Sequence, residues 1–215
     1  MANTIKIIEL FLLGFIFPML IVFFEFSKYI LVMLWIVFVY AIILYFFIYN
    51  KKLKIRDFFF LDLKENKEYL IFILIRWLLL SIILYFLTKY LFPDKLFIIQ
   101  NQSKDLLYKI FFFYPILSAF PQEYIFCTFF FLRYSLLFKN SKVMIIMSAL
   151  IFCFAHIFSL NYVAPILSIF GGYFFATTYK RTKSLLIVSL EHSLYGNTLF
   201  FLGLGWYFWG GSVGQ

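Results

Sequence analysis

Uninterrupted apolar runs of about 20 residues recur along the whole chain, and they limit its possible folds more strongly than any other feature. A helix of that length crosses the hydrocarbon layer of a bilayer, where every backbone amide and carbonyl needs a partner within the protein. The runs do not alternate every second residue as the strands of a membrane barrel do. The sequence therefore predicts an all-α, polytopic transmembrane helix bundle.

Composition favours this interpretation over the alternative, a soluble all-helical enzyme with a large core. Hydrophobic residues make up 65% of the 215 residues, aromatic residues make up 25%, and the mean hydropathy is +0.96. Too little polar surface remains to cover a soluble globule. Cys127 and Cys153 both lie in apolar segments and indicate neither a disulfide framework nor a zinc-binding pair of cysteines. The first run has no small-residue cleavage site, so we expect a retained span and not a removed signal peptide.

About seven spans are expected, with six to eight as the possible range. They cover residues 5–25, 30–49, 69–89, 108–137, 143–160, 163–179 and 184–204. The fourth is long enough to form two pieces, and Pro115 and Pro121 are natural places for a kink or a break. Neither an internal repeat nor a linker divides the sequence, so residues 1–215 are expected to form a single integral membrane domain.

The basic residues predict the orientation of the bundle. With the N-terminus in the cytoplasm, the inner flanks hold 13 Lys and Arg residues, and the outer flanks hold only Lys28, Lys89, Lys95, Lys104 and Lys109. The hydrophilic loop KKLKIRDFFFLDLKENKEY would then lie inside, and the C-terminal GLGWYFWGGSVGQ would lie outside. The net charge of +9 therefore reflects topology. Because no basic stripe with interleaved aromatics is present, nucleic acid is not an expected partner.

A small set of ionisable residues remains at depth once the flanking charges are set aside: Glu9, Glu25, Arg76, Glu123, His156, Glu191 and His192. Such groups are costly in a membrane and therefore point to function. Glu9 and Glu25 lie near the ends of the first span and are expected to reach the interface. Arg76 either pairs with a buried carboxylate or extends past Trp77, and we do not expect it to be catalytic. The sequence assigns no role to Glu191.

Three of these residues and one amide lie at similar depths in their predicted spans. At a rise of about 1.5 Å per residue, Glu123, His156 and Asn197 each lie about 20 Å above the inner end of their helix, and His192 lies about 12 Å above it. His156 and His192 are the only histidines of the chain. A carboxylate base, two imidazoles and an amide donor are the groups that a water-activating site requires.

At these residues the chain resembles the CPBP family, membrane-embedded proteases that include CAAX prenyl endopeptidases and bacteriocin-processing or immunity proteins. The family pattern is EExxxR, followed by FxxxH and by HxxxN or HxxxD. The matching pieces are QEYIFC at 122–127, FCFAH at 152–156 and HSLYGN at 192–197, within a region of about residues 105–210. The resemblance implies a helical membrane fold and hydrolysis of a peptide bond by water that a glutamate activates without a metal.

The resemblance also implies roles for individual residues. Glu123 would be the general base, and His156 would assist at the water. His192 and Asn197 would stabilise the tetrahedral oxyanion. Gln122, Cys127 and Phe152 would support the site.

Departures from the pattern leave a second function open. Gln122 stands in place of the first glutamate and Cys127 in place of the arginine, so Glu123 lacks a permanent positive partner at i+4. Gly196 occupies the usual amide position, and a kink there would be needed to turn Asn197 inward. The alternative is a catalytically inactive immunity or scaffold protein of the same type, which binds a membrane peptide without cutting it.

Two further site chemistries are ranked below hydrolysis. One glutamate and two histidines resemble a zinc ligand set, but HExxH is absent and the family resemblance points to a metal-free mechanism, so no cofactor is expected. A small transporter or proton relay would also use buried Glu and His, although it would be expected to carry paired broken helices or internal symmetry. The expected partners are a membrane-associated peptide or protein and the lipid bilayer, and the expected location is the cytoplasmic membrane of a bacterium.

Overall fold

The part of the chain that the computed structural model describes, residues 2–49, 63–138 and 140–208, forms seven long helical segments, called spans below, and contains no strand. The spans are α1 (Ala2–Phe11) continued by η1 (Leu12–Ile16) and α2 (Phe17–Phe23); α3 (Ile30–Tyr49); α5 (Leu63–Leu91); a run from α7 (Lys104–Tyr114) to α9 (Phe130–Arg133); α10 (Ser141–Phe154); α11 (Val163–Thr182); and α12 (Leu185–Leu202). The short connecting elements are η2 (Phe26–Tyr29), η3 (Pro93–Lys95), α6 (Ile98–Gln102), η6 (Ile157–Ser159) and η7 (Leu204–Phe208). The predicted fold class is confirmed.

Six segments of the described residues are long and apolar enough to cross a membrane. They are Asn3–Phe23, Phe26–Phe47, Asn66–Leu91, Lys104–Arg133, Ser141–Ser159 and Leu185–Leu202. The seventh helical segment, α11, is 20 residues long but is not among these six, and its last turn carries Lys180 and Arg181. The protein is therefore an integral membrane protein. Its orientation and bacterial source stay predictions, and most of the loop 51–69 and the end of the C-terminal segment, 209–215, lie outside the described residues.

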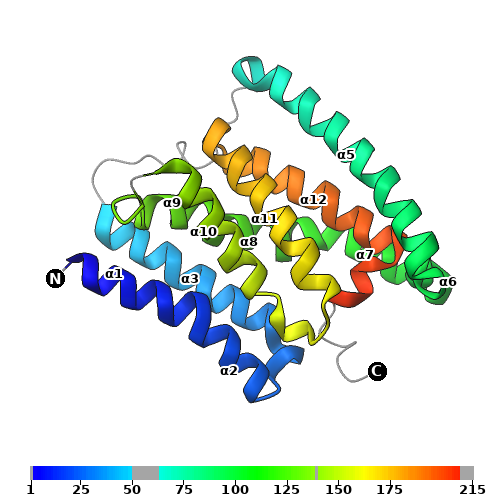
Figure 1. The fold of residues 1–215 in the computed structure, drawn as a ribbon, viewed down its shortest axis with the longest axis horizontal. Helices are drawn as coiled ribbons and strands as arrows, with labels where there is room; N and C mark the ends of the chain where they lie inside the picture. The colour runs from blue at the N-terminus through cyan, green and yellow to red at the C-terminus, as the bar shows by residue number, and fades with distance from the viewer. Residues whose placement is uncertain (1, 50–62, 139, 209–215) are drawn as a thin grey trace.

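The spans are arranged around α12. Buried residues make up 61% of the membrane-crossing segment of α12 and only 6% of that of α5. Figure 1 shows α5 along one outer edge and α1, α2 and α3 along the opposite edge, with α10, α11 and α12 between them and α7 and α8 behind. The last third of the sequence therefore forms the centre of the bundle, and the earlier spans enclose it.

The fourth span is one continuous helix from Lys104 to Arg133, so the two-piece alternative is not found. Its prolines are absorbed by two π-helical segments, η4 (Pro115–Ala119) and η5 (Tyr124–Phe129), on either side of the single turn α8 (Phe120–Glu123). A π-helical turn holds an extra residue, which changes the direction of the side chains that follow, and such turns are frequent at functional sites. Here they flank the turn that carries Gln122 and Glu123.

A glycine permits the closest helix packing in the centre of the bundle. A Cβ atom at Gly172 of α11 would lie 3.0 Å from the Cα of Ala149 and 3.1 Å from the Cβ of Phe152, both in α10. Small residues let membrane helices approach backbone to backbone. This contact packs Phe152 of the FxxxH motif tightly against α11.

A partly buried ion pair joins the first span to the fourth. Glu9 accepts hydrogen bonds from Arg133 at 2.5 and 3.0 Å and from the hydroxyl of Tyr134 at 2.8 Å. The Arg133 and Glu9 side chains are 11% and 10% exposed. Glu9 is therefore paired with a cation, and its expected position at the membrane interface stays a prediction. Glu25 is exposed in the turn before η2, and its expected position at the interface also stays a prediction.

Candidate active site

A mainly apolar cavity of about 850 Å³ lies at the centre of the bundle and receives side chains from most of the spans. The groups on its wall that can do acid, base or hydrogen-bonding chemistry include His156, His192, Gln122 and Tyr114. Gly196 and Phe152 also line it, whereas Glu123 and Asn197 do not. Two of the four predicted catalytic residues therefore face the cavity directly.

Glu123 ends the turn α8 and is fully buried behind His192. His192 Nδ1 lies 2.6 Å from Glu123 Oε1, although the two residues are 69 positions apart in the chain. The other carboxylate oxygen, Oε2, is buried and has no hydrogen-bond partner among the described residues. The structure thus joins the buried glutamate to one imidazole in a direct hydrogen bond.

The imidazole of His192 is held on several sides. Its Nε2 lies 2.8 Å from the hydroxyl of Tyr114. The ring stacks on Phe175 with 4.4 Å between centroids and meets the Phe152 ring edge-on at 5.7 Å. Tyr114 was not singled out from the sequence, since it is one of 16 tyrosines and no local pattern distinguishes it.

His156 lies just beyond the end of α10, in the turn that leads to η6, although it still falls within the membrane-crossing segment. Its Nδ1 lies 2.7 Å from the carbonyl oxygen of Phe152, which only accepts, so Nδ1 donates. The FxxxH spacing therefore has a physical reason, because it brings this carbonyl within reach of the ring. The Phe152 ring is also 4.8 Å from the imidazole of His156. Phe152 thus contacts both histidines.

Gln122 lines the cavity, whereas its neighbour Glu123 does not. Its Nε2 donates a hydrogen bond to Ser118 Oγ at 2.8 Å, and its Oε1 is buried without a partner among the described residues. Cys127, which stands in place of the arginine, is buried, and its thiol lies close to the Glu123 carboxylate. The turn α8 therefore places the amide of Gln122 on the cavity wall and buries the carboxylate of Glu123 away from the cavity.

Asn197 does not turn inward as a kink at Gly196 would require, because α12 continues as a helix to Leu202. Asn197 Nδ2 donates to the carbonyl oxygen of Phe111 at 3.3 Å. Gly196 lines the cavity in its place. The oxyanion-binding role of Asn197 stays a prediction.

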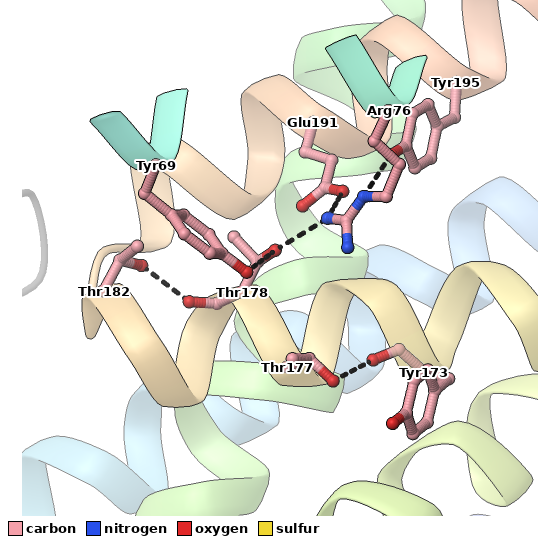
Figure 2. Close-up of polar contacts among 8 residues, drawn as sticks. All are labelled: Tyr69, Arg76, Tyr173, Thr177, Thr178, Thr182, Glu191 and Tyr195. Carbon is pink, nitrogen blue, oxygen red and sulfur yellow. Dashed lines mark hydrogen bonds and ion pairs between the residues drawn. The ribbon is translucent and has the colours of Figure 1, made fainter. Parts of the chain in front are cut away.

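A second polar cluster lies on the other side of α12 and is drawn in Figure 2. Arg76 of α5 forms an ion pair with Glu191 and donates hydrogen bonds to the hydroxyls of Tyr195 at 3.0 Å and Thr178 at 3.3 Å. The Thr178 hydroxyl also lies 3.2 Å from that of Tyr69. Of the two alternatives for Arg76, the structure therefore has the one in which it pairs with a buried carboxylate.

Among the residues that the structure describes, no three His, Cys, Asp or Glu side chains gather as a metal-binding group. One ring nitrogen of each histidine is within hydrogen-bonding distance of a protein oxygen, His192 Nδ1 of the Glu123 carboxylate and His156 Nδ1 of the Phe152 carbonyl. Whether a metal takes part stays a prediction to be tested by elemental analysis.

Comparison with known proteins indicates the type of protein that part of the chain resembles. Residues 104–198, somewhat less than half of the chain, match the family model described as type II CAAX prenyl endopeptidase Rce1-like. No curated protein and no solved structure gives a match. The matched segment runs from α7 into α12 and contains all four predicted catalytic residues. The match confirms the resemblance to the CPBP family of CAAX proteases and supports a CAAX-type intramembrane protease, with peptide or protein substrates in a bilayer.

Proposed function

We propose that the protein is an intramembrane endopeptidase of the CAAX type that hydrolyses a peptide bond of a membrane-associated substrate, with Glu123 acting through His192. The observation that supports this most directly is the 2.6 Å contact between His192 Nδ1 and Glu123 Oε1. It joins a carboxylate sealed from the cavity to an imidazole that lines the cavity. The pair can therefore remove a proton from water without water reaching the carboxylate.

The positions of the protons follow from the hydrogen bonds. An ionised carboxylate can only accept, so Nδ1 of His192 carries a hydrogen and donates it to Glu123. In the neutral imidazole, Nε2 is then the acceptor, and it is the nitrogen that faces Tyr114. A carboxylate in this position fixes the tautomer and stabilises the imidazolium that forms when Nε2 takes a proton. Glu123 therefore supplies the negative charge, and His192 Nε2 is the atom that receives the proton.

His156 provides a second basic nitrogen on the same wall. Because its Nδ1 donates to the Phe152 carbonyl, its Nε2 is the acceptor in the neutral ring. Both imidazoles contact the Phe152 ring, so they lie on one patch of the cavity. A water bound there would be oriented by His156 while His192 accepts its proton.

The proposal is tested by hydrolysis with the purified protein in detergent micelles. The probe is a quenched-fluorescent, farnesylated peptide that ends in Cys-Val-Ile-Met. Glu123→Gln and His192→Ala should each lower kcat by at least about 10²-fold, the contribution expected of a positioned base. Glu25→Gln makes the same carboxylate-to-amide change at an exposed turn and should leave kcat unchanged. Hydrolysis by Glu123→Gln at the wild-type rate would contradict the proposal.

A second candidate function is peptide binding without cleavage, and one observation favours it. Gln122 lines the cavity, whereas none of the lining residues in the described part of the chain is a carboxylate. An amide cannot accept a proton from water as a carboxylate does. This candidate predicts that the wild-type protein binds the farnesylated peptide and releases it intact by mass spectrometry, and that Gln122→Glu gains hydrolysis. Cleavage by the wild-type protein would exclude it.

A further inference from the structure

We infer that Tyr114 is a further catalytic residue of this site, whose hydroxyl donates a hydrogen bond to the oxyanion that forms on the substrate carbonyl. The inference rests on the proposed function, because it needs a peptide bond attacked beside His192. It is carried by the position of the Tyr114 hydroxyl, 2.8 Å from His192 Nε2 on the cavity wall. The nitrogen proposed to take the proton from water thus has a hydroxyl donor beside it.

Tyr114 fills the space that a side chain at position 196 of α12 would need, because residue 196 is a glycine. A Cβ atom built on Gly196 would lie 2.2 Å from Tyr114 Cε1 and 2.3 Å from its hydroxyl oxygen. No residue with a side chain can occupy position 196 while Tyr114 keeps this position. The glycine one turn after His192 therefore admits a donor from α7 to a place next to the imidazole.

The Tyr114 ring is held before any substrate arrives. It is the last residue of α7, directly before the π-helical segment that begins at Pro115. Its ring meets those of His192 and Phe200 edge-on, at centroid distances of 5.8 and 5.3 Å. A donor fixed in advance in a water-poor cavity stabilises a developing negative charge without reorganisation, which is the requirement for an oxyanion donor.

Binding of the substrate carbonyl would draw this donor away from His192. With Nδ1–H donating to Glu123, Nε2 accepts the hydrogen of the Tyr114 hydroxyl in the resting state. The single lone pair of Nε2 can take a proton from water only after this hydrogen has turned to the substrate oxygen. Turning the Tyr114 hydroxyl to the substrate oxygen therefore frees the base and places a donor where the negative charge will form.

The complete reaction needs only water and the peptide. One water proton passes to His192 Nε2, and the water oxygen forms a bond to the carbonyl carbon. The electron pair of the C=O double bond moves onto the oxygen, which accepts the hydrogen bond from Tyr114. The C–N bond then breaks as the carbonyl reforms, and the proton on Nε2 passes to the leaving nitrogen.

Kinetics of Tyr114→Phe test the inference, because this change removes only the hydroxyl. With the farnesylated peptide, we expect kcat to fall about 10²-fold, as for the loss of one oxyanion donor, with KM changed less than about threefold. Tyr108→Phe removes a hydroxyl from an exposed position of the same helix and should leave both constants unchanged. An unchanged kcat for Tyr114→Phe would overturn the inference.

A binding measurement separates failure of this inference from failure of the proposed function. The probe is the same peptide truncated to a C-terminal aldehyde, whose hydrate carries a tetrahedral carbon, and it is compared with the matching amide. Tyr114→Phe should weaken aldehyde binding by at least about tenfold and leave amide binding unchanged. If the wild-type protein hydrolyses nothing but this selective loss occurs, the hydrolytic function fails and the donor role stands. If the preference for the aldehyde over the amide is equal in the wild type and in Tyr114→Phe, the donor role fails.

Moving the hydrogen-bond donor from position 114 to position 196 gives an independent test. Gly196→Asn alone should abolish hydrolysis, because its side chain collides with Tyr114. In the double variant Tyr114→Ala with Gly196→Asn, an amide donor enters the vacated space, and kcat should exceed that of Tyr114→Ala by about tenfold or more. If kcat of the double variant is no higher than that of Tyr114→Ala, the inference fails, because a donor placed in this space does not speed hydrolysis.

Discussion

The ion pair between Arg76 and Glu191 allows a quantitative prediction about stability. Glu191 is fully buried and the Arg76 side chain is 15% exposed, so neither charge is well hydrated. Arg76→Leu would leave the Glu191 carboxylate without its cation and would also remove the hydrogen bonds to Thr178 and Tyr195. Removing one partner of a buried pair costs about 3–5 kcal/mol, mainly because the remaining charge is uncompensated.

Thermal unfolding in detergent, followed by tryptophan fluorescence, measures this loss. For a chain of this size, about 3–5 kcal/mol corresponds to a decrease in Tm on the order of 10 °C. Lys89→Leu is the matched control, because it removes an exposed cation from the same helix, and its Tm should change little. The double variant Arg76→Leu with Glu191→Leu should recover most of the loss, since no buried charge is left. A single variant as stable as Lys89→Leu, or a double variant as unstable as Arg76→Leu, would refute the reasoning.

Three further predictions concern packing, a second ion pair and metal content. Gly172→Val should lower the free energy of unfolding by about 3 kcal/mol in urea titrations, because the new Cβ would meet the backbone of α10, which cannot move aside. The control is Gly171→Val, whose Cβ would meet only the Phe175 ring, and it should lower the free energy of unfolding by less. Arg133→Met should destabilise the protein by on the order of 3 kcal/mol by leaving the Glu9 carboxylate without its cation, and adding Glu9→Met should reverse most of the loss in the same titration. Elemental analysis of hydrolytically active protein should find less than stoichiometric zinc. An equimolar zinc content would contradict the metal-free mechanism.

The arrangement of the spans was largely predictable because the bilayer fixes it. Helices must be about 20 residues long and must satisfy their own backbone, so run lengths alone place most spans correctly. The fourth span was harder, since Pro115 and Pro121 would break an isolated helix. In the structure the π-helical segments accept both prolines within one continuous helix. Whether a helix accommodates its prolines in this way depends on the surrounding helices, so the hydropathy of the sequence does not predict it.

Only part of the candidate site could be predicted from the sequence, and the directions of its side chains could not. Glu123 and His192 could be singled out because buried titratable groups are rare in a membrane chain, and the structure joins them. Which of Gln122 and Glu123 faces the cavity depends on the π-helical turns around α8, and one residue of register decides it. Tyr114 could not be found at all, since a tyrosine among so many aromatic residues becomes distinctive only when Gly196 makes room for it.

The two polar clusters of the bundle are connected through consecutive residues of α12. Side chains of neighbouring helical residues point about 100° apart, so Glu191 faces Arg76 of α5 while His192 faces Glu123 and the cavity. Any rotation or sliding of α12 that moves the imidazole away from Glu123 must also strain the ion pair. Since misplacement of a reacting group by about 1 Å can cost about 10²-fold in rate, Arg76→Leu should lower kcat even at temperatures well below its Tm. We therefore predict that Arg76 positions His192, and an Arg76→Leu variant that loses stability while keeping the wild-type kcat would contradict this prediction.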